Sequence, residues 1–176
     1  MKVGVLFSTS TGNCETVGGY IVQAAKAAGL DVDDLKEVSE AREIEKYSGL
    51  IVGAPTWNTG ADSERSGTSW DEWLYSDLPS LNLKDKKVAV FGVGDQISYG
   101  DNFCDAAGEL YDQFLKAGCK MLGFTSTDGY DHDDSKALLP DGRFCGLMLD
   151  EDNQSEESEG RANKWIEQLK GEGLFA

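Results

Sequence analysis

The sequence predicts an α/β sandwich built on a parallel sheet of about five strands, and three observations support this. Short apolar runs alternate with segments of helical periodicity from one end of the chain to the other. The runs are continuously apolar, which is typical of strands that are covered on both faces. Strands that alternate with helices imply βαβ crossovers. At 176 residues, we expect residues 1–176 to form one domain with a single sizeable core.

The predicted elements follow in order along the chain. The strands are the apolar runs at residues 3–7, 32–35 (a weaker run), 50–54, 88–93 and 121–124. Residues at helical spacing give three buried helix stripes: Val17, Ile21, Ala24 and Ala28; Phe103, Ala107, Leu110, Phe114 and Ala117; and Ala162, Trp165, Ile166 and Leu169. Gly29 and Gly118 follow two of these helices as natural C-terminal stops. Asn153 with Glu156 resembles a capping box for the last helix, which would account for the acidic residues 150–159.

Two stretches do not fit the pattern. Residues 58–69 are polar and contain glycine, and residues 126–142 form a long loop or small hairpin before the apolar segment 143–149. Loops of this length are uncommon unless they are functional or family-specific. His132, the single histidine, lies in the second stretch. We interpret it as a solvated loop residue rather than a proton relay.

The charge balance excludes several partners. Asp and Glu number 32 against 16 Lys and Arg, a formal net charge of -16 with a pI near 4.3. Such a surface repels nucleic acid and anionic lipid. The totals leave open whether the charge serves solubility alone or steers the protein towards a basic partner.

The cysteines and the apolar runs bear on the compartment. The four cysteines form no C-x-x-C pair, so the sequence indicates neither a zinc site nor a dithiol motif, and we predict no metal. A reduced intracellular compartment fits best. The first apolar run is too short for a signal peptide, and no stretch reaches 18 apolar residues. We therefore expect a soluble chain without membrane insertion.

The loop after the first strand predicts an anion site. It reads STSTGN and leads into a helix, so hydroxyls and backbone N–H groups gather at a helix N-terminus. An ordinary N-cap needs one or two hydroxyls, whereas this loop has four. It lacks the lysine of a triphosphate-binding loop, and the pair Gly92 and Gly94 is followed by Ile97 where a dinucleotide fingerprint needs glycine. A single terminal phosphate held by neutral donors fits best.

Two further loops carry aromatic side chains beyond strand ends, where ligands of open parallel sheets bind. Residues 54–60, APTWNTG, place Trp57 at the mouth of the sheet, although a core-packing role for Trp57 stays open. Residues 94–103, GDQISYGDNF, supply Tyr99 with several carboxylates and carboxamides. One phosphate loop flanked by two aromatic loops describes a site for a flat ring joined to a phosphate.

With these loops in hand, the chain resembles a flavodoxin of the long-chain subgroup. Five segments are similar to family segments, in the family's order: STSTGNCET, APTWNTG, FGVGDQISYGDNF, STDGYDHDDSKAL and GLMLDEDNQ. The resemblance implies the family's three-layer sandwich, with helices on both faces of a five-stranded parallel sheet of order 2-1-3-4-5. This order is the family's known one and is not worked out from these residues. It also implies that the long loop interrupts strand 5.

The resemblance implies FMN as the cofactor and assigns its ligands. The phosphate would lie on Thr9, Ser10, Thr11, Gly12, Asn13 and Cys14. The flavin ring would lie between Trp57 and Tyr99. The ring edges and ribityl chain would be lined by Pro55, Thr56, Asn58, Thr59, Gly60, Gly94, Asp95 and Asn102, with Asp150 close by. Family members commonly carry threonine at the position of Cys14, so a thiol there would weaken phosphate binding.

The implied function is that of a low-potential one-electron carrier that cycles between the FMN semiquinone and hydroquinone and replaces ferredoxin. It would not be an enzyme. We expect a monomer that docks on basic faces such as those of ferredoxin–NADP reductase and photosystem I. The stretch 61–70 resembles red-algal forms, so the compartment would be a bacterial cytoplasm or an algal chloroplast stroma.

Two alternatives share the fold. An FMN-dependent quinone or nitro reductase would need space over the ring, which Trp57 and Tyr99 should block. A phospho-receiver domain is disfavoured because Ser8 and Pro55 stand where it needs acidic residues.

Overall fold

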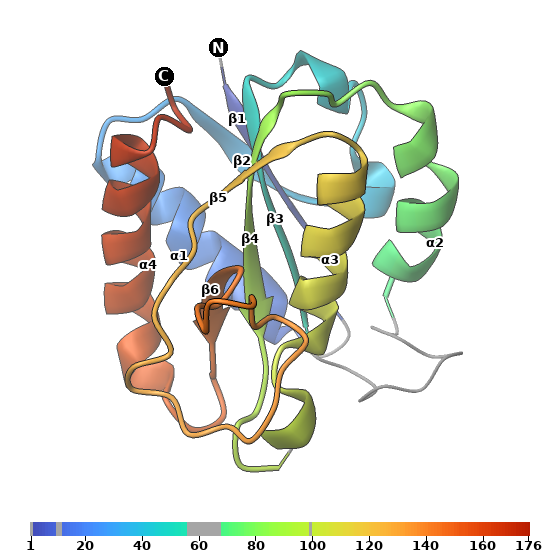
Figure 1. Cartoon of the computed structure of the whole chain (residues 1–176). Helices are drawn as coiled ribbons and strands as arrows, with labels where there is room; N and C mark the ends of the chain where they lie inside the picture. Colours follow the sequence, from blue (N-terminus) through green and yellow to red (C-terminus); the bar gives the residue numbers. More distant parts are fainter. Residues whose placement is uncertain (1, 10–11, 56–67, 99) are drawn as a thin grey trace.

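The computed structural model describes residues 2–9, 12–55, 68–98 and 100–176. Its parallel sheet has the strand order β2-β1-β3-β4-β5, and a sixth strand, β6, also pairs with β4 (Figure 1). The strands are β1 (Val3–Phe7), β2 (Val32–Glu37), β3 (Gly49–Pro55), β4 (Lys87–Val93), β5 (Lys120–Leu122) and β6 (Gly146–Leu149). The predicted order 2-1-3-4-5 is confirmed.

Strands β5 and β6 are two pieces of one sheet position. β5 pairs with Lys87–Ala89 in the first half of β4, and β6 pairs with Val90–Val93 in the second half. Between them the chain leaves the sheet over residues 123–145, which we call the insert. The expected interruption of the fifth strand is confirmed.

Helices cover both faces of the sheet (Figure 1). The helices are α1 (Asn13–Ala27), α2 (Trp70–Ser76), α3 (Asp105–Lys116) and α4 (Ser155–Gly171). α1 and α4 lie on one face, and α2 and α3 lie on the other. In the part of the chain that the structure describes, no helix is long and apolar enough to cross a membrane.

Alternate strand residues enter two separate cores, one on each face of the sheet, so the expectation of a single core was wrong. Burial on both faces explains the unbroken apolar runs. Leu50 and Val52 of β3 pack towards α2 and α3, whereas Ile51 packs towards α1 and α4, and all three are fully buried. Burying an aliphatic side chain of this size contributes about 1.5–3 kcal/mol. Pairing with both neighbours and packing on both faces therefore make β3 a rigid base for the loop that follows it.

The two glycine stops are confirmed. Gly29 after α1 has φ +73° and Gly118 after α3 has φ +90°, a region that side-chain-bearing residues rarely adopt. The next residues then return an N–H to the helix, with Leu30 N–H donating to Ala25 O at 3.0 Å. Each helix therefore ends where its glycine permits the turn.

Two predictions, one about Phe103 and one about His132, were wrong. Phe103 is not part of the α3 stripe, because Cys104, at φ 55°, separates it from the first helical residue, Asp105. His132 is half-buried rather than solvated, and its ring lies 5.6 Å from the Phe103 ring and 5.3 Å from that of Phe144. The aromatic side chains of the insert therefore pack on the main domain.

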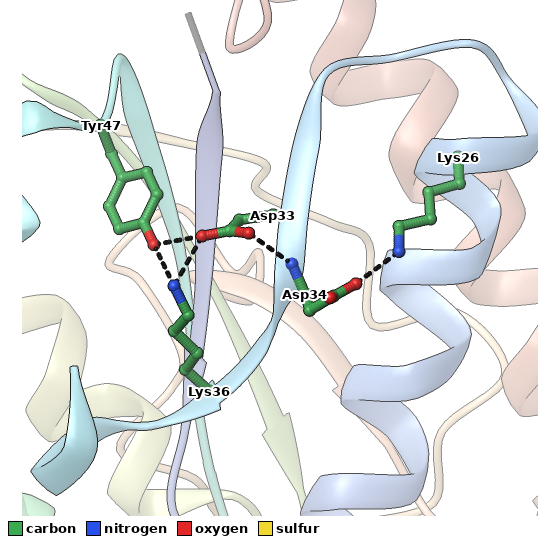
Figure 2. A network of polar contacts seen from close by, with 5 residues as sticks. All are labelled: Lys26, Asp33, Asp34, Lys36 and Tyr47. Carbon is green, nitrogen blue, oxygen red and sulfur yellow. Dashed lines mark hydrogen bonds and ion pairs between the residues drawn. The ribbon is translucent and has the colours of Figure 1, made fainter.

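A polar network lies along β2, at one end of the strand order (Figure 2). The Tyr47 hydroxyl donates to Asp33 Oδ2 at 2.6 Å, and Lys36 Nζ donates to the same oxygen at 2.7 Å. These bonds from Lys36 and Tyr47 hold the pKa of Asp33 well below its usual range. Charged side chains on an edge strand oppose pairing with a second sheet. The Tyr47 ring also needs Gly4 beneath it, since a Cβ at that position would lie 2.6 Å from the ring.

Candidate functional site

The carboxyl ends of β1, β3 and β4 meet at one edge of the sheet. Phe7 pairs with Gly53, Pro55 pairs with Val93, and Ser8 N–H donates to Gly53 O at 3.4 Å. Nine predicted site residues are described: Thr9, Gly12, Asn13, Cys14, Pro55, Gly94, Asp95, Asn102 and Asp150. The others lie outside the described residues: Ser10, Thr11, Thr56, Trp57, Asn58, Thr59, Gly60 and Tyr99.

The β1–α1 loop ends in a turn that exposes helix N–H groups. Gly12 has φ 92° and donates its N–H to Thr9 Oγ1 at 2.9 Å, and α1 begins at the next residue, Asn13. Thr16 N–H donates to Gly12 O at 3.1 Å. The N–H groups of residues 13–15 therefore have no acceptor within the helix, and the helix dipole is positive at this end. This geometry suits a phosphate.

Cys14 contributes differently from the expectation. Its side chain is fully buried in the core shared with α4, and burial raises the pKa of the thiol although a hydrogen bond with the Ser8 backbone opposes the shift. The thiol lies in the core, so a contribution of Cys14 to an anion site would come from its backbone N–H. The Cys14 side chain therefore acts on core packing.

The loop after β4 is organised by a carboxylate. Asp95 Oδ1 accepts N–H bonds from Ile97 at 3.0 Å and Ser98 at 2.9 Å, and a third from Asn153 Nδ2 at 2.8 Å. Burial raises the pKa of Asp95, but the bonds from Ser98 and Asn153 outweigh it and lower the pKa overall. Asp95 therefore stays ionised at this edge of the sheet at neutral pH.

Asn153 bridges two carboxylates, and the predicted capping box is wrong. α4 begins at Ser155 after Gln154, and no side chain caps it. Asn153 Nδ2 instead donates to Asp95 Oδ1 and to Asp150 Oδ2, both at 2.8 Å. Because the amide bonds the ends of two loops, it joins the β4 loop to the turn after β6.

Asn102 is directed towards helix α3. It ends the short 3-10 helix Gly100–Asn102, and its Nδ2 donates to Asp105 Oδ2 at 3.0 Å. The other oxygen of Asp105 accepts Lys136 N–H at 2.8 Å. The structure thus places Asn102 beside the insert, while Gly94 is anchored to β6 by its N–H bond to Leu149 O at 2.9 Å.

Comparison with known proteins identifies the family. Residues 5–165 match the flavodoxin family. The chain belongs to the flavodoxin family. It is 45% identical to the flavodoxin of a Nostoc species over 97% of this chain and 96% of that one, and 42% identical to the Synechocystis flavodoxin over 96% of each chain. A crystal structure of Fusobacterium nucleatum flavodoxin bound to flavin mononucleotide has a TM-score of 0.82 at 31% identity, covering 97% of this chain and 98% of that chain.

Family membership confirms the resemblance inferred from the five segments. Flavodoxins are electron-transfer proteins rather than enzymes, and the curated relatives at 39–45% identity are cyanobacterial long-chain members. The insert between β5 and β6 is therefore the long loop that the resemblance to long-chain flavodoxins predicts.

Negative charge gathers at this edge. Burial, together with the nearby carboxylates Asp95 and Asp150, raises the pKa of Asp152. Among the described residues, no group of three or more His, Cys, Asp or Glu side chains is arranged to hold a metal ion. A groove of about 490 Å³ lies elsewhere, beside α2, and is lined by residues such as Arg42, Trp73 and Leu81 rather than by predicted site residues.

Sequence reasoning missed Gln96. It lies in the β4 loop and is only 4% exposed, and both its backbone and its side chain bond to Asp150. A loop glutamine carries no local signal of burial, so only the tertiary partner reveals it.

Proposed function

We propose that this flavodoxin binds FMN without a covalent bond and acts as a low-potential one-electron carrier that replaces ferredoxin, cycling between semiquinone and hydroquinone. The proposal rests on one observation, that two loops suited to an FMN site lie at the same edge of the sheet. The β1–α1 loop offers helix N–H groups to a phosphate, and the β4 loop, at the same sheet edge on the far side of β3, holds the ionised Asp95. The FMN-bound F. nucleatum structures, similar over nearly the whole chain, support the choice of cofactor.

The residues present fit a phosphorylated flavin. The Thr9 hydroxyl and the N–H of Asn13, held by the turn at Gly12, would begin a cradle of neutral donors, and Ser10 and Thr11, inferred from sequence, would complete it. Trp57 and Tyr99 would cover the ring, as the family resemblance implies. Bound FMN supplies the electron chemistry, and the protein sets the potential through stacking, hydrogen bonds and charge.

The chain's own charge favours a low potential. Adding an electron to a ring beside Asp95 increases negative charge near a carboxylate that hydrogen bonds keep ionised. The neutral phosphate cradle adds no cation to offset this. The net charge of -16 extends the same effect to the whole surface.

The same charge supports transient docking on basic partners. We infer that the chain acts as a monomer and docks on faces such as those of ferredoxin–NADP reductase and photosystem I, in a bacterial cytoplasm or an algal stroma. Electrostatic steering predicts association rates that fall steeply with added salt. Rates with a reductase that are indifferent to ionic strength would contradict the docking part alone.

The test of the cofactor compares FMN with riboflavin, which is the same ring without the phosphate. We expect FMN to bind the apoprotein and riboflavin to bind about 100-fold more weakly, because several charge-assisted hydrogen bonds are lost. Anaerobic reductive titration should then pass through a stable blue neutral semiquinone. A protein that stays colourless with FMN would refute the proposal, and turnover of NADPH by the protein alone would favour a reductase instead.

A further inference from the structure

Gln96 has every polar atom of its side chain bonded, although it lies in a loop. Its backbone N–H and its Nε2 each donate to Asp150 Oδ2 at 3.0 Å, and Nε2 also donates to Gln154 Oε1 at 2.9 Å. Its Oε1 accepts the N–H of Asp131. A carboxamide has two N–H donors and one carbonyl acceptor, so this side chain is fully used.

Asp150 is the buried anchor of these bonds. It directly follows β6 and is 0% exposed, and its carboxylate accepts five hydrogen bonds. Two come from Gln96, one from the Asp152 N–H, and two from Asn153. A buried carboxylate is tolerated when such donors surround it, and removal of a donor leaves an unbalanced buried charge. The β4 loop is therefore held by a rigid acceptor on the neighbouring strand.

The insert donates further hydrogen bonds to the loop after β4. Asp131 supplies the N–H to Gln96, and the N–H groups of residues 133 and 134 both donate to Gly100 O at 2.9 Å. Tyr130 is held beneath Arg161 of α4, whose guanidinium carbon lies 4.2 Å from the ring centroid, and its hydroxyl donates to Met148 O. The segment 94–98 is thus fixed on one side by β6 and on the other by the insert.

We propose that Gln96 is a positioning residue for the cofactor: through Asp150 and Asp131 it fixes the β4 loop at the sheet edge where the flavin would bind. The inference rests on the proposed FMN site. Gln96 touches neither the phosphate loop nor Pro55 among the described contacts, so it acts through the loop backbone, including the turn around Asp95. Freeing the loop would then impose an ordering cost on flavin binding.

The experiment compares Gln96→Met with Gln168→Met. Methionine keeps the chain length and removes the amide. Gln168 is the matched control because its Nε2 also makes two bonds, to Phe124 O at 2.8 Å and Glu172 Oε1 at 2.9 Å, near the C-terminal end of α4 and away from the site. Two readouts are taken: hydrogen exchange of the amides 96–98 in the apoprotein, and the FMN dissociation constant with the reduction potentials.

Gln96→Met removes all three side-chain hydrogen bonds of Gln96. We expect amide exchange at 96–98 to quicken about 10-fold, the FMN dissociation constant to rise about 10-fold, and the potentials to shift. Gln168→Met should change none of these, and it should cost less overall stability because Gln168 is half-buried and bonds no buried carboxylate. Wild-type exchange and affinity in Gln96→Met would overturn the inference, as would equal effects of the two variants. If Gln96→Met does not fold, Gln96→Asn should show the same changes at smaller size. Absence of FMN binding by the wild type would refute the proposed function, while exchange in the apoprotein still decides the role of Gln96.

Discussion

Replacing Gly108 with alanine should separate the insert from α3. Gly108 is buried in α3, and a Cβ there would lie 2.2 Å from Lys136 O and 2.9 Å from Ala137 N in the insert. An ordinary carbon–oxygen contact is about 3.3 Å, so the backbone of the insert would have to retreat by about 1 Å. That movement would also break the bond from Lys136 N–H to Asp105 Oδ1, now 2.8 Å.

The change in the free energy of unfolding is the balance of two destabilising contributions and one stabilising contribution. Overpacking costs about 1–3 kcal/mol, and a lost hydrogen bond to a charged group costs about 1.5–3 kcal/mol. Alanine regains about 1 kcal/mol of helix propensity. We expect Gly108→Ala to lower the free energy of unfolding by about 3 kcal/mol and the Tm by about 9 °C for a chain of this size.

Gly160→Ala is the matched control, because Gly160 lies within α4 and its added Cβ would meet nothing within 4 Å. It should stabilise the protein by up to about 1 kcal/mol. The assay is urea unfolding of the apoprotein followed by far-ultraviolet circular dichroism, since bound ligand would add its own stabilisation. Equal stability of the two variants would show that the insert does not rest on α3 as the structure has it.

Three other predictions concern single groups. Asp33→Asn should lower the free energy of unfolding by about 1 kcal/mol at pH 7, after allowance for solvent screening. Because the bond to Lys36 lowers the Asp33 pKa, this loss of stability should shrink as the pH falls below about 4. A loss that does not depend on pH would contradict the role of the Asp33 carboxylate. The control, Asp34→Asn at the exposed ion pair with Lys26, should have no measurable effect in the same urea series. The Cys119 thiol, whose pKa burial raises to about 11, should react with a disulfide reagent at pH 8 more than about 100-fold slower than in the unfolded chain, and equal rates would contradict its burial. Gly12 has φ 92°, so Gly12→Ala should lower the free energy of unfolding of the apoprotein by about 1–2 kcal/mol and weaken FMN binding. Unchanged stability and unchanged affinity would show that the turn tolerates a side chain.

The fold was predictable because its signals are local. A strand buried on both faces needs an unbroken apolar run, and the three central strands have one. The helix ends at Gly29 and Gly118 need a positive φ, which the sequence marks with glycine. The phosphate loop could be proposed for the same reason, since its hydroxyls and the helix start are neighbours in sequence, and it stays a prediction.

Cys14 shows that one error was avoidable. It shares a face of α1 with Val17, Gly18 and Ile21, at the spacing i, i+3, i+4 and i+7, and all four are buried. The helix stripe was predicted to begin at Val17. Extending it by one turn towards the loop would have placed the thiol in the core, leaving the backbone N–H for the phosphate.

The remaining errors follow from partners that are distant in sequence. Asn153 and Glu156 have the spacing of a capping box, but Asn153 bonds Asp95, which lies 58 residues earlier. Local spacing cannot reveal that a carboxylate from another loop competes for the amide. His132 was judged by its polar neighbours, whereas the rings of Phe103 and Phe144 decide its burial.

The insert combines both kinds of error. A polar stretch such as 126–142 suggests exposure, yet the backbone N–H groups of residues 131, 133 and 134 are satisfied by Gln96 and by Gly100 O. The half-buried Tyr130 lies against Phe103 and Phe144. Backbone groups that leave a sheet must find new acceptors, and here the acceptors belong to the loop that the cofactor would need. A segment that interrupts strand 5 can therefore support the β4 loop because the interruption releases N–H groups beside it. We therefore expect hydrogen exchange of amides 96–98 to depend on this link, which no pattern within either segment expresses.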